Sequence, residues 1–316
     1  TVFDWGVHDK KIIDLDTVEW VEDAMDQASD KPRFMAAGIF RPHMPFYSDQ
    51  ETYDKYPYES LKMPAYKAND LDDVSTIARN MANKEFFITD NVLGKPERHP
   101  GSLHTFVKSY QAASDYADQM VGRLLDKLDA TGEADNTIII LFSDHGYHLG
   151  DKESCVKFTL WEKANHVPFI IVAPGITKPG TVCSQPVSLL DIYPTLVGLC
   201  ELPIKEDIDG RSLVSLLKDP DSTWDQPALM TMGRGNHAIR SDRWRYIRYS
   251  DGSEELYDHE NDPWEWNNLA GDPQFSAVIA EHKTWIPKTE VPWQIDESKN
   301  WIYTREIWED KPVNEK

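Results

Sequence analysis

Residues Thr137–Lys157, TIIILFSDHGYHLGDKESCVK, decide the fold of this chain. The stretch opens with an unbroken apolar and β-branched run, 137–142, bounded by polar residues. Such a run is typical of a strand buried on both faces of a parallel sheet. It ends at Asp144 and His145, and in open α/β sheets the functional groups lie just beyond the carboxyl ends of strands. The stretch therefore predicts an α/β fold with a site at these two residues.

The side chains after this strand have a definite chemistry. Asp144 offers a hard oxygen ligand, His145 a nitrogen, and Lys157 a fixed positive charge. This set suits a metal ion together with an anionic substrate. An aspartate at a strand end is also a common turn former, and His-Gly is a common turn pair. These residues by themselves leave both a functional and a structural interpretation open.

Composition restricts the classes of partner. The chain has 316 residues with 54 acidic and 33 basic side chains, a formal charge of −21, and contains no block of five Lys or Arg. Nucleic acid and anionic membrane surfaces are therefore not expected as partners. A sulfate or phosphate site has to be made positive locally, by a metal, lysines and histidines. No apolar run approaches twenty residues, so no transmembrane helix is expected. Three cysteines allow either one disulfide with one thiol or three thiols.

A second motif lies upstream. Phe34–Phe40 is short and apolar and predicts another buried strand. It runs directly into Arg41-Pro42-His43-Met44-Pro45-Phe46, where two prolines hold the chain extended around one histidine. His43 thus follows a predicted strand, as His145 does. A lone histidine between prolines is usually only a loop residue.

The remaining pattern predicts helices packed on a sheet, followed by a smaller β-rich part. Apolar residues spaced by threes and fours over 103–128 predict a long amphipathic helix. Further expected elements are helices over 17–28 and 188–199, a short helix ending at Leu217, strands over 167–173, 238–240, 244–249 and 255–257, and a hairpin turn at Asp251-Gly252. We expect a large α/β domain over 1–225, incomplete at its N-terminus, and a C-terminal subdomain with tail over 226–316.

Taken together, these motifs resemble a known family. Ser143-Asp144-His145-Gly146, Leu149-Gly150-Asp151, Lys157, His166–Ile171 and Pro174-Gly175 closely resemble the signature of the sulfatase family in the alkaline-phosphatase-like superfamily. Arg41–Phe46 is similar to a basic-Pro-His-x-Pro-Phe sequence in the branch that includes iduronate-2-sulfatase. The resemblance implies an alkaline-phosphatase-like fold: a largely parallel central sheet flanked by helices, with a smaller C-terminal antiparallel subdomain.

The resemblance also implies roles for single residues. Asp144 and His145 match two ligands of the family's one divalent ion, usually Ca²⁺, although an imidazole is a less usual partner for so hard a cation. Lys157 matches the lysine that contacts sulfate and nucleophile. His43 matches the histidine that faces the sulfate, where it would contact substrate or protonate the leaving oxygen. The alternative for Lys157 is a solvated surface charge.

Three other histidines are secondary candidates. His148 lies in the same loop as Asp144, where it would line the pocket and bind substrate. His237 follows a glycine-rich loop that would border the substrate cleft. His166, just before a predicted buried strand, is better explained as a structural hydrogen bonder.

Two family features have no counterpart in these 316 residues. The family's nucleophile is a formylglycine made from the first residue of a Cys/Ser-x-Pro-x-Arg motif, and Cys155, Cys183 and Cys200 all lack the proline two places on. The family's pair of metal-binding aspartates is also missing, since Asp72-Asp73 follows no apolar strand and indicates a solvated turn. The chain matches about the C-terminal two thirds of the family's fold. We therefore expect an N-terminal segment, cleaved, separate or omitted, without which the chain is inactive.

These expectations define one function and two rivals. The chain is expected to be a sulfuric-ester hydrolase acting on a sulfated sugar or polysaccharide, in the periplasm or outside the cell. Within the same superfamily the rival is a phosphodiesterase or phosphonate monoester hydrolase. From a different class, the rival is a non-catalytic carbohydrate-binding relative that kept the fold and lost the nucleophile.

Overall fold

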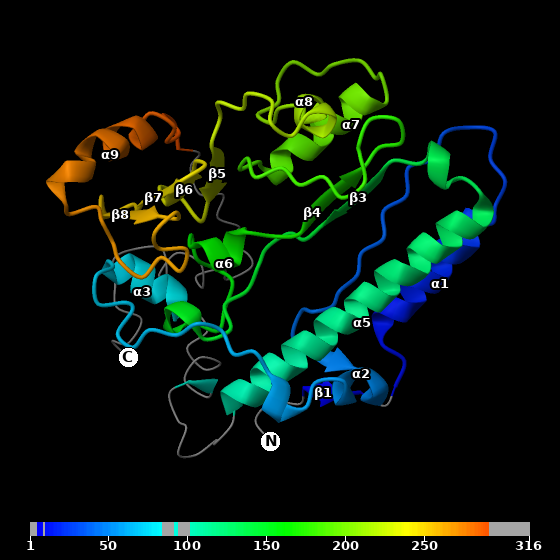
Figure 1. Ribbon diagram of the computed structural model, residues 1–316, viewed down its shortest axis with the longest axis horizontal. Helices are drawn as coiled ribbons and strands as arrows, with labels where there is room; N and C mark the ends of the chain where they lie inside the picture. Colours follow the sequence, from blue (N-terminus) through cyan, green and yellow to red (C-terminus); the bar gives the residue numbers. More distant parts are fainter. Residues whose placement is uncertain (1–4, 9, 84–91, 94–101, 291–316) are drawn as a thin grey trace, which may run out of the picture. The chain divides into compact units, whose positions relative to one another are not determined.

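The computed structural model describes all residues except 1–4, 9, 84–91, 94–101 and 291–316 (Figure 1). The chain divides into two compact units. Unit 1 comprises residues 1–64 and 90–137, and unit 2 comprises 65–89 and 138–316. Each unit is described by itself. The predicted boundary between residues 225 and 226 does not coincide with this division and stays a prediction.

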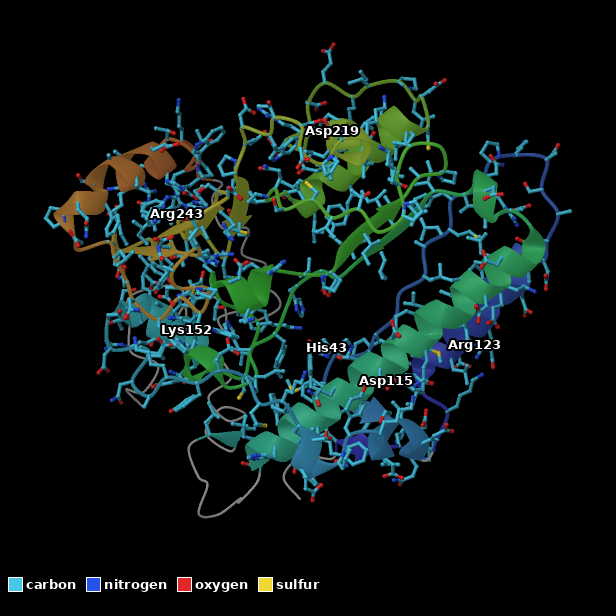
Figure 2. All side chains as sticks on the ribbon, viewed as in Figure 1. His43, Asp115, Arg123, Lys152, Asp219 and Arg243 are labelled. Atoms are coloured by element: carbon cyan, nitrogen blue, oxygen red, sulfur yellow. The ribbon has the colours of Figure 1, made fainter. Side chains whose placement is uncertain are left out.

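Unit 1 is built on two helices that pack along each other, α1 (Ile13–Met25) and α5 (Ser102–Thr131). The long amphipathic helix predicted from the sequence is therefore confirmed. Val18 of α1 is buried with Tyr116 and Met120 of α5. At the rim, Arg123 binds Glu22 through two hydrogen bonds of 3.0 and 2.6 Å (Figure 2 labels Arg123).

Short elements complete unit 1. They are the parallel pair β1 (Gly6–Val7) and β2 (Tyr47–Ser48), helix α2 (Gln50–Asp54), and single turns of 3₁₀ helix at Tyr58–Ser60 and Ala134–Asn136. The strand predicted over Phe34–Phe40 is wrong for this structure. That segment has no regular secondary structure, no described strand pairs with it, and Phe34 is 81% exposed. Apolar sequence alone does not make a strand, because a neighbour must supply the hydrogen bonds.

In unit 2, β3 (Ile139–Phe142) lies within the predicted strand 137–142 and pairs with β4 (Phe169–Val172). The pair is antiparallel, with Ile139 opposite Val172 and Phe142 opposite Phe169. The expected parallel pairing and burial on both faces are therefore wrong for these two strands. All eight residues are apolar, yet none is fully buried, and Ile170 is 54% exposed. Hydropathy identified the strand, but the partner's direction depends on long-range contacts.

The C-terminal part of unit 2 contains the expected antiparallel sheet. Its strands, in spatial order, are β5 (Ala228–Thr231), β6 (His237–Arg240), β7 (Trp244–Arg248) and β8 (Glu254–Asp258). The turn at Asp251-Gly252 is confirmed: Gly252 has φ +86° and the Asp251 carboxylate accepts the N–H of Ser253 at 2.8 Å. Both faces are covered, so Ile247 and Tyr257 are buried in one core and Ile239 and Leu256 in another.

Unit 2 also contains short helices. They are α3 (Thr76–Ala82), α6 (Glu162–Asn165), α7 (Ile192–Leu199), α8 (Val214–Lys218) and α9 (Ser276–Lys283), with 3₁₀ turns at Asp151–Glu153, Leu189–Asp191 and Pro273–Phe275. The helix expected over 188–199 is confirmed, and Ser188 and Asp191 form a capping box at its start. Cys155, Cys183 and Cys200 are thiols. Among the described helices, none is long and apolar enough to cross a membrane.

Candidate functional site

The turn after β3 places two potential ligand atoms side by side. The Asp144 carboxylate uses Oδ1 to accept the N–H of His145 at 3.0 Å, and the side chain is 82% exposed. His145 Nδ1 lies 2.8 Å from the carbonyl oxygen of Gly146, so Nδ1 carries the proton and Nε2 the lone pair. That Nε2 is 3.5 Å from Asp144 Oδ2. Two atoms so spaced can both reach one ion at bond lengths of about 2.0 to 2.6 Å.

Gly146 fixes this turn against helix α6. Its N–H donates to the carbonyl of Ala164 at 2.8 Å. A Cβ at this position would lie far inside van der Waals contact with the carbonyl oxygen of Lys163. The glycine is therefore required for the close approach of two backbones, not for a left-handed conformation.

The loop beyond Gly146 folds back on itself. The N–H of His148 donates to Val156 at 2.9 Å, and the N–H of Gly150 donates to Ser154 at 2.8 Å. Tyr147 donates its hydroxyl to the Cys155 carbonyl at 2.8 Å. These bonds bring residues 154–156 back beside residues 147–150, so that Lys157 follows directly after the paired segment. Lys157 is half-buried, and its Nζ lies 5.6 Å from the Phe158 ring centroid. Asp144 and His145 therefore lie at the start of this hydrogen-bonded loop, and Lys157 lies at its end.

His148 is fully buried within that loop. Its Nδ1 lies 2.5 Å from Asp151 Oδ2 and its Nε2 lies 2.6 Å from Thr159 Oγ1. Burial opposes ionisation of Asp151, but the adjacent imidazole and backbone N–H groups lower the pKa of the carboxyl overall. This geometry gives His148 a bracing function. Its predicted contact with substrate stays a prediction.

The other two candidate histidines of unit 2 differ sharply in exposure. His237, on β6, is buried, with Nε2 2.7 Å from Glu290 and Nδ1 2.9 Å from Thr231 Oγ1. His166 has a side chain that is 77% exposed and lies 3.3 Å from Glu162. The predicted role of His237 at a substrate cleft stays a prediction.

His43 lies in unit 1, on the loop between α1 and β2, and its side chain is exposed (Figure 2). Its Nδ1 is 2.7 Å from the Met44 carbonyl oxygen, and its ring centroid lies 4.7 Å from that of Phe40. The peptide bonds before Pro42 and Pro45 are both cis. Because His43 belongs to one unit and Asp144, His145 and Lys157 to the other, their expected convergence stays a prediction.

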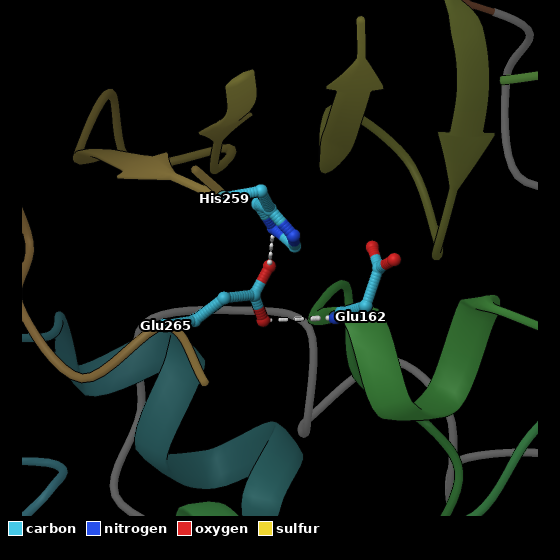
Figure 3. Close-up of side chains that lie close together, drawn as sticks. All are labelled: Glu162, His259 and Glu265. Carbon is cyan, nitrogen blue, oxygen red and sulfur yellow. Dashed lines mark hydrogen bonds and ion pairs between the residues drawn. The ribbon is translucent and has the colours of Figure 1, made fainter. Parts of the chain in front are cut away.

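Sequence reasoning did not identify a cluster formed by Glu162, His259 and Glu265 (Figure 3). One ligand atom from each lies within 4.8 Å of the others. His259 Nε2 is 3.0 Å from Glu265 Oε1, and Glu265 Oε2 accepts the N–H of Glu162 at 2.9 Å. No local pattern connects these three positions, because Glu162 lies about a hundred positions before the other two and meets them only in the folded chain.

An arginine already neutralises this cluster. Arg245 is buried, binds the Glu162 carboxylate and lies 2.8 Å from Glu265. Burial opposes ionisation of Glu162, but Arg245 and Arg240 hold its pKa at about 2. A metal ion would have to displace the guanidinium. The donor set therefore fits a buried ion-pair network that fastens α6 to β7, and the turn at Asp144 and His145 is the better metal candidate.

Two family profiles match the chain. The profile described as sulfatase matches residues 3–202, and the profile described as N-sulphoglucosamine sulphohydrolase, C-terminal, matches 150–291. A protein of Formosa agariphila named sulfatase is 35% identical over 93% of this chain and 57% of its own length. An ulvan-active sulfatase of the same organism is 31% identical over 88% and 51%. The chain spans about half the length of these curated relatives.

Solved structures agree on the fold. A protein in complex with its substrate D-glucosamine-2-N,6-O-disulfate matches with a TM-score of 0.71 at 21% identity, covering 88% of this chain and 69% of its own. The phosphonate monoester hydrolase of Silicibacter pomeroyi matches with 0.72 at 26% identity, covering 85% and 58%. The expected alkaline-phosphatase-like fold with a smaller C-terminal antiparallel sheet is thereby confirmed. From the profile match and these relatives, the chain belongs to the sulfatase family.

Proposed function

We propose that this chain acts in a sulfuric-ester hydrolase that removes sulfate from a sulfated sugar or polysaccharide. The observation that carries the proposal is the Asp144–His145 pair, whose ligand atoms lie 3.5 Å apart at the end of β3 in a chain of the sulfatase family. The ulvan-active relative and the disulfated glucosamine bound by a structural neighbour support a sulfated carbohydrate as substrate. Such substrates suit a periplasmic or extracellular enzyme.

In this proposal each residue has one task. Asp144 Oδ2 and His145 Nε2 hold a single divalent cation, with Ca²⁺ favoured by the carboxylate. When bound, the cation stabilises negative charge on the sulfate oxygens. Lys157 anchors the sulfate, and protonated His43 gives its Nε2 proton to the leaving oxygen. His148 and His237 would contribute to the substrate pocket through the loops that they brace.

Two ligands are too few for Ca²⁺, which takes six to eight oxygens. We propose that an N-terminal segment of the same fold supplies the remaining ligands and the formylglycine nucleophile. The apolar strands β3 and β4 support this, because Phe142, Ile170 and Val172 are exposed, and adjoining exposed apolar side chains mark a surface that another segment covers. The greater length of the curated relatives supports it as well.

A phosphonate monoester hydrolase is the second candidate, because the Silicibacter pomeroyi enzyme is 26% identical with a TM-score of 0.72. A non-catalytic carbohydrate-binding relative is the third. Parallel assays of the full-length protein with an aryl sulfate and an aryl phosphate or phosphonate ester separate the three. Sulfatase activity is expected to dominate, and absence of all turnover would favour the binding protein.

The site itself is tested by Asp144→Asn, with Asp72→Asn as the matched control on an exposed turn. In the full-length protein we expect Asp144→Asn to lower Ca²⁺ affinity and turnover by about 100-fold or more. Mutating residues that only hydrogen-bond to metal ligands already lowers metal affinity or activity by about 10- to 100-fold. Asp72→Asn should change neither. Equal effects of the two variants would contradict the assignment.

A further inference from the structure

The loop that carries His43 is held by a buried ion pair. Asp14, in the first turn of α1, and Arg41 are both buried. Asp14 Oδ1 accepts the backbone N–H groups of Phe40 and of Arg41, the latter at 3.1 Å. Its Oδ2 faces Arg41 Nε at 3.7 Å. One carboxylate therefore fixes both the backbone and the guanidinium at the point where the loop begins.

Arg41 in turn donates hydrogen bonds to the loop on both sides of Met44. Its Nη1 donates to the carbonyl of His43 at 2.8 Å and to that of Pro45 at 3.0 Å. The guanidinium also lies 5.0 Å from the Phe40 ring centroid and 5.6 Å from that of Tyr47. A planar group with several donors and two aromatic neighbours fits this place, and a lysine ammonium does not reproduce it.

The Met44 carbonyl, which lies between the carbonyls of His43 and Pro45 in sequence, orients the His43 imidazole. The Met44 carbonyl can only accept a hydrogen bond, so the His43 Nδ1 that lies 2.7 Å from it carries a proton. A second proton on the ring then occupies Nε2. The tautomer and ring direction of His43 therefore depend on a carbonyl whose neighbours on both sides are bound by Arg41.

We propose that Asp14 and Arg41 are positioning residues that fix the tautomer and direction of His43. The inference rests on the proposed function where it gives His43 the role of proton donor. Burial lowers the pKa of Arg41, and the charge of Asp14 opposes that shift. Burying such a pair is costly and seldom improves stability over apolar residues, whereas it does fix a geometry.

The geometric half is tested on the 316-residue chain with ¹⁵N-labelled histidine. NMR shifts of the ring nitrogens above the titration range report which nitrogen of His43 carries the proton. In the parent chain we expect the Nδ1–H form of His43. In Arg41→Lys we expect a shift toward the Nε2–H form, which is the form that free histidine favours. Arg123→Lys is the matched control, because Arg123 also binds a carboxylate of α1 but lies far along α5. An unchanged tautomer in Arg41→Lys would overturn the proposal.

Asp14→Asn covers the case in which Arg41→Lys does not fold. Asparagine keeps one oxygen for the N–H groups of Phe40 and Arg41, but it removes the charge and puts an amide nitrogen, which cannot accept a hydrogen bond, in place of the oxygen that faces Arg41. We expect the same tautomer shift in Asp14→Asn. If the tautomer of His43 does not change, the positioning role of Asp14 is rejected.

The catalytic half is tested on the full-length protein with two sulfate esters. A good leaving group needs no proton, so Arg41→Lys should lower kcat about 10-fold or more for an alkyl sulfate and little for an aryl sulfate of low leaving-group pKa. Equal losses on both esters would overturn a role in proton donation. If neither ester is hydrolysed by the parent protein, the proposed function fails, and the NMR result still decides the positioning.

Discussion

The N–H of Gly146 lies 2.8 Å from the carbonyl oxygen of Ala164, where two backbone segments meet with room for no side chain. This contact joins the Asp144–His145 turn directly to α6. Through Glu162, α6 is in turn bound to Arg245 of β7. The candidate metal turn thus depends on a sheet whose strand β7 begins about eighty positions beyond α6 in sequence.

Gly146→Ala should be strongly destabilising, because its Cβ would enter the space of the Lys163 carbonyl. Overpacking typically costs about 1 to 3 kcal/mol in free energy of unfolding, and a clash with backbone belongs at the upper end. Thermal unfolding measures the effect. Gly122→Ala, in the middle of α5 with nothing within 4 Å, is the control and should leave stability unchanged or raise it slightly. Equal melting temperatures for the two variants would contradict the close approach.

Arg245→Met should destabilise unit 2, because it leaves the half-buried carboxylate of Glu162 and the buried carboxylate of Glu265 without their main counter-charge. Removing one partner of a buried ion pair costs about 3 to 5 kcal/mol. Urea unfolding followed by tryptophan fluorescence is the measurement. Arg211→Met, which breaks an exposed pair with Asp225 in the same unit, should cost about 1 kcal/mol or less.

The same network predicts a loss of stability in acid. The pKa of Glu162 is about 2 in the folded chain against an ordinary value of 4.5, so its stabilising effect is present above pH 4.5 and is lost as pH falls through about 2. Stability measured between pH 5 and pH 2.5 should fall more steeply in the parent chain than in Glu162→Gln. Parallel curves would show that Glu162 is not held ionised.

Glu255 should act in the opposite direction. Burial raises its pKa to about 7, while Trp161 and Tyr257 donate hydrogen bonds to it at 2.8 Å. A raised pKa means that the contribution of this carboxyl is full below about pH 4.5 and is lost as pH rises through about 7. Glu255→Gln should therefore gain stability relative to the parent chain between pH 5 and pH 9. Glu281→Gln, on the exposed surface of α9, should show no such trend.

His148→Ala distinguishes bracing from substrate contact. The ring bonds Asp151 and Thr159 in a fully buried place, so its removal should lower the melting temperature by several degrees, as is usual for a broken buried network. His166→Ala, with its exposed side chain, should leave the melting temperature unchanged. A rise in KM for the full-length enzyme with unchanged melting temperature would instead support direct substrate binding by His148.

The elements that local pattern determined were found correctly. Three- and four-residue spacing predicted α5, an apolar run predicted β3, and Asp251-Gly252 predicted the β7–β8 hairpin. The adjacency of Asp144 and His145 in one turn also followed from their neighbouring positions. Phe34–Phe40 shows the limit of this reasoning, because an apolar stretch becomes a strand only when another segment pairs with it.

By itself the sequence determined the family signature, the positions of α5, β3, β4 and the β7–β8 hairpin, and the residues beyond β3 that can bind an ion and an anion. Only the tertiary structure decided the antiparallel pairing of β3 with β4, the burial of His148, and the ion pairs Asp14–Arg41 and Glu162–Arg245. The physical reason is range. Hydropathy and turn chemistry act between near neighbours, whereas Glu162 and Arg245 are 83 positions apart and meet only when the whole core has formed.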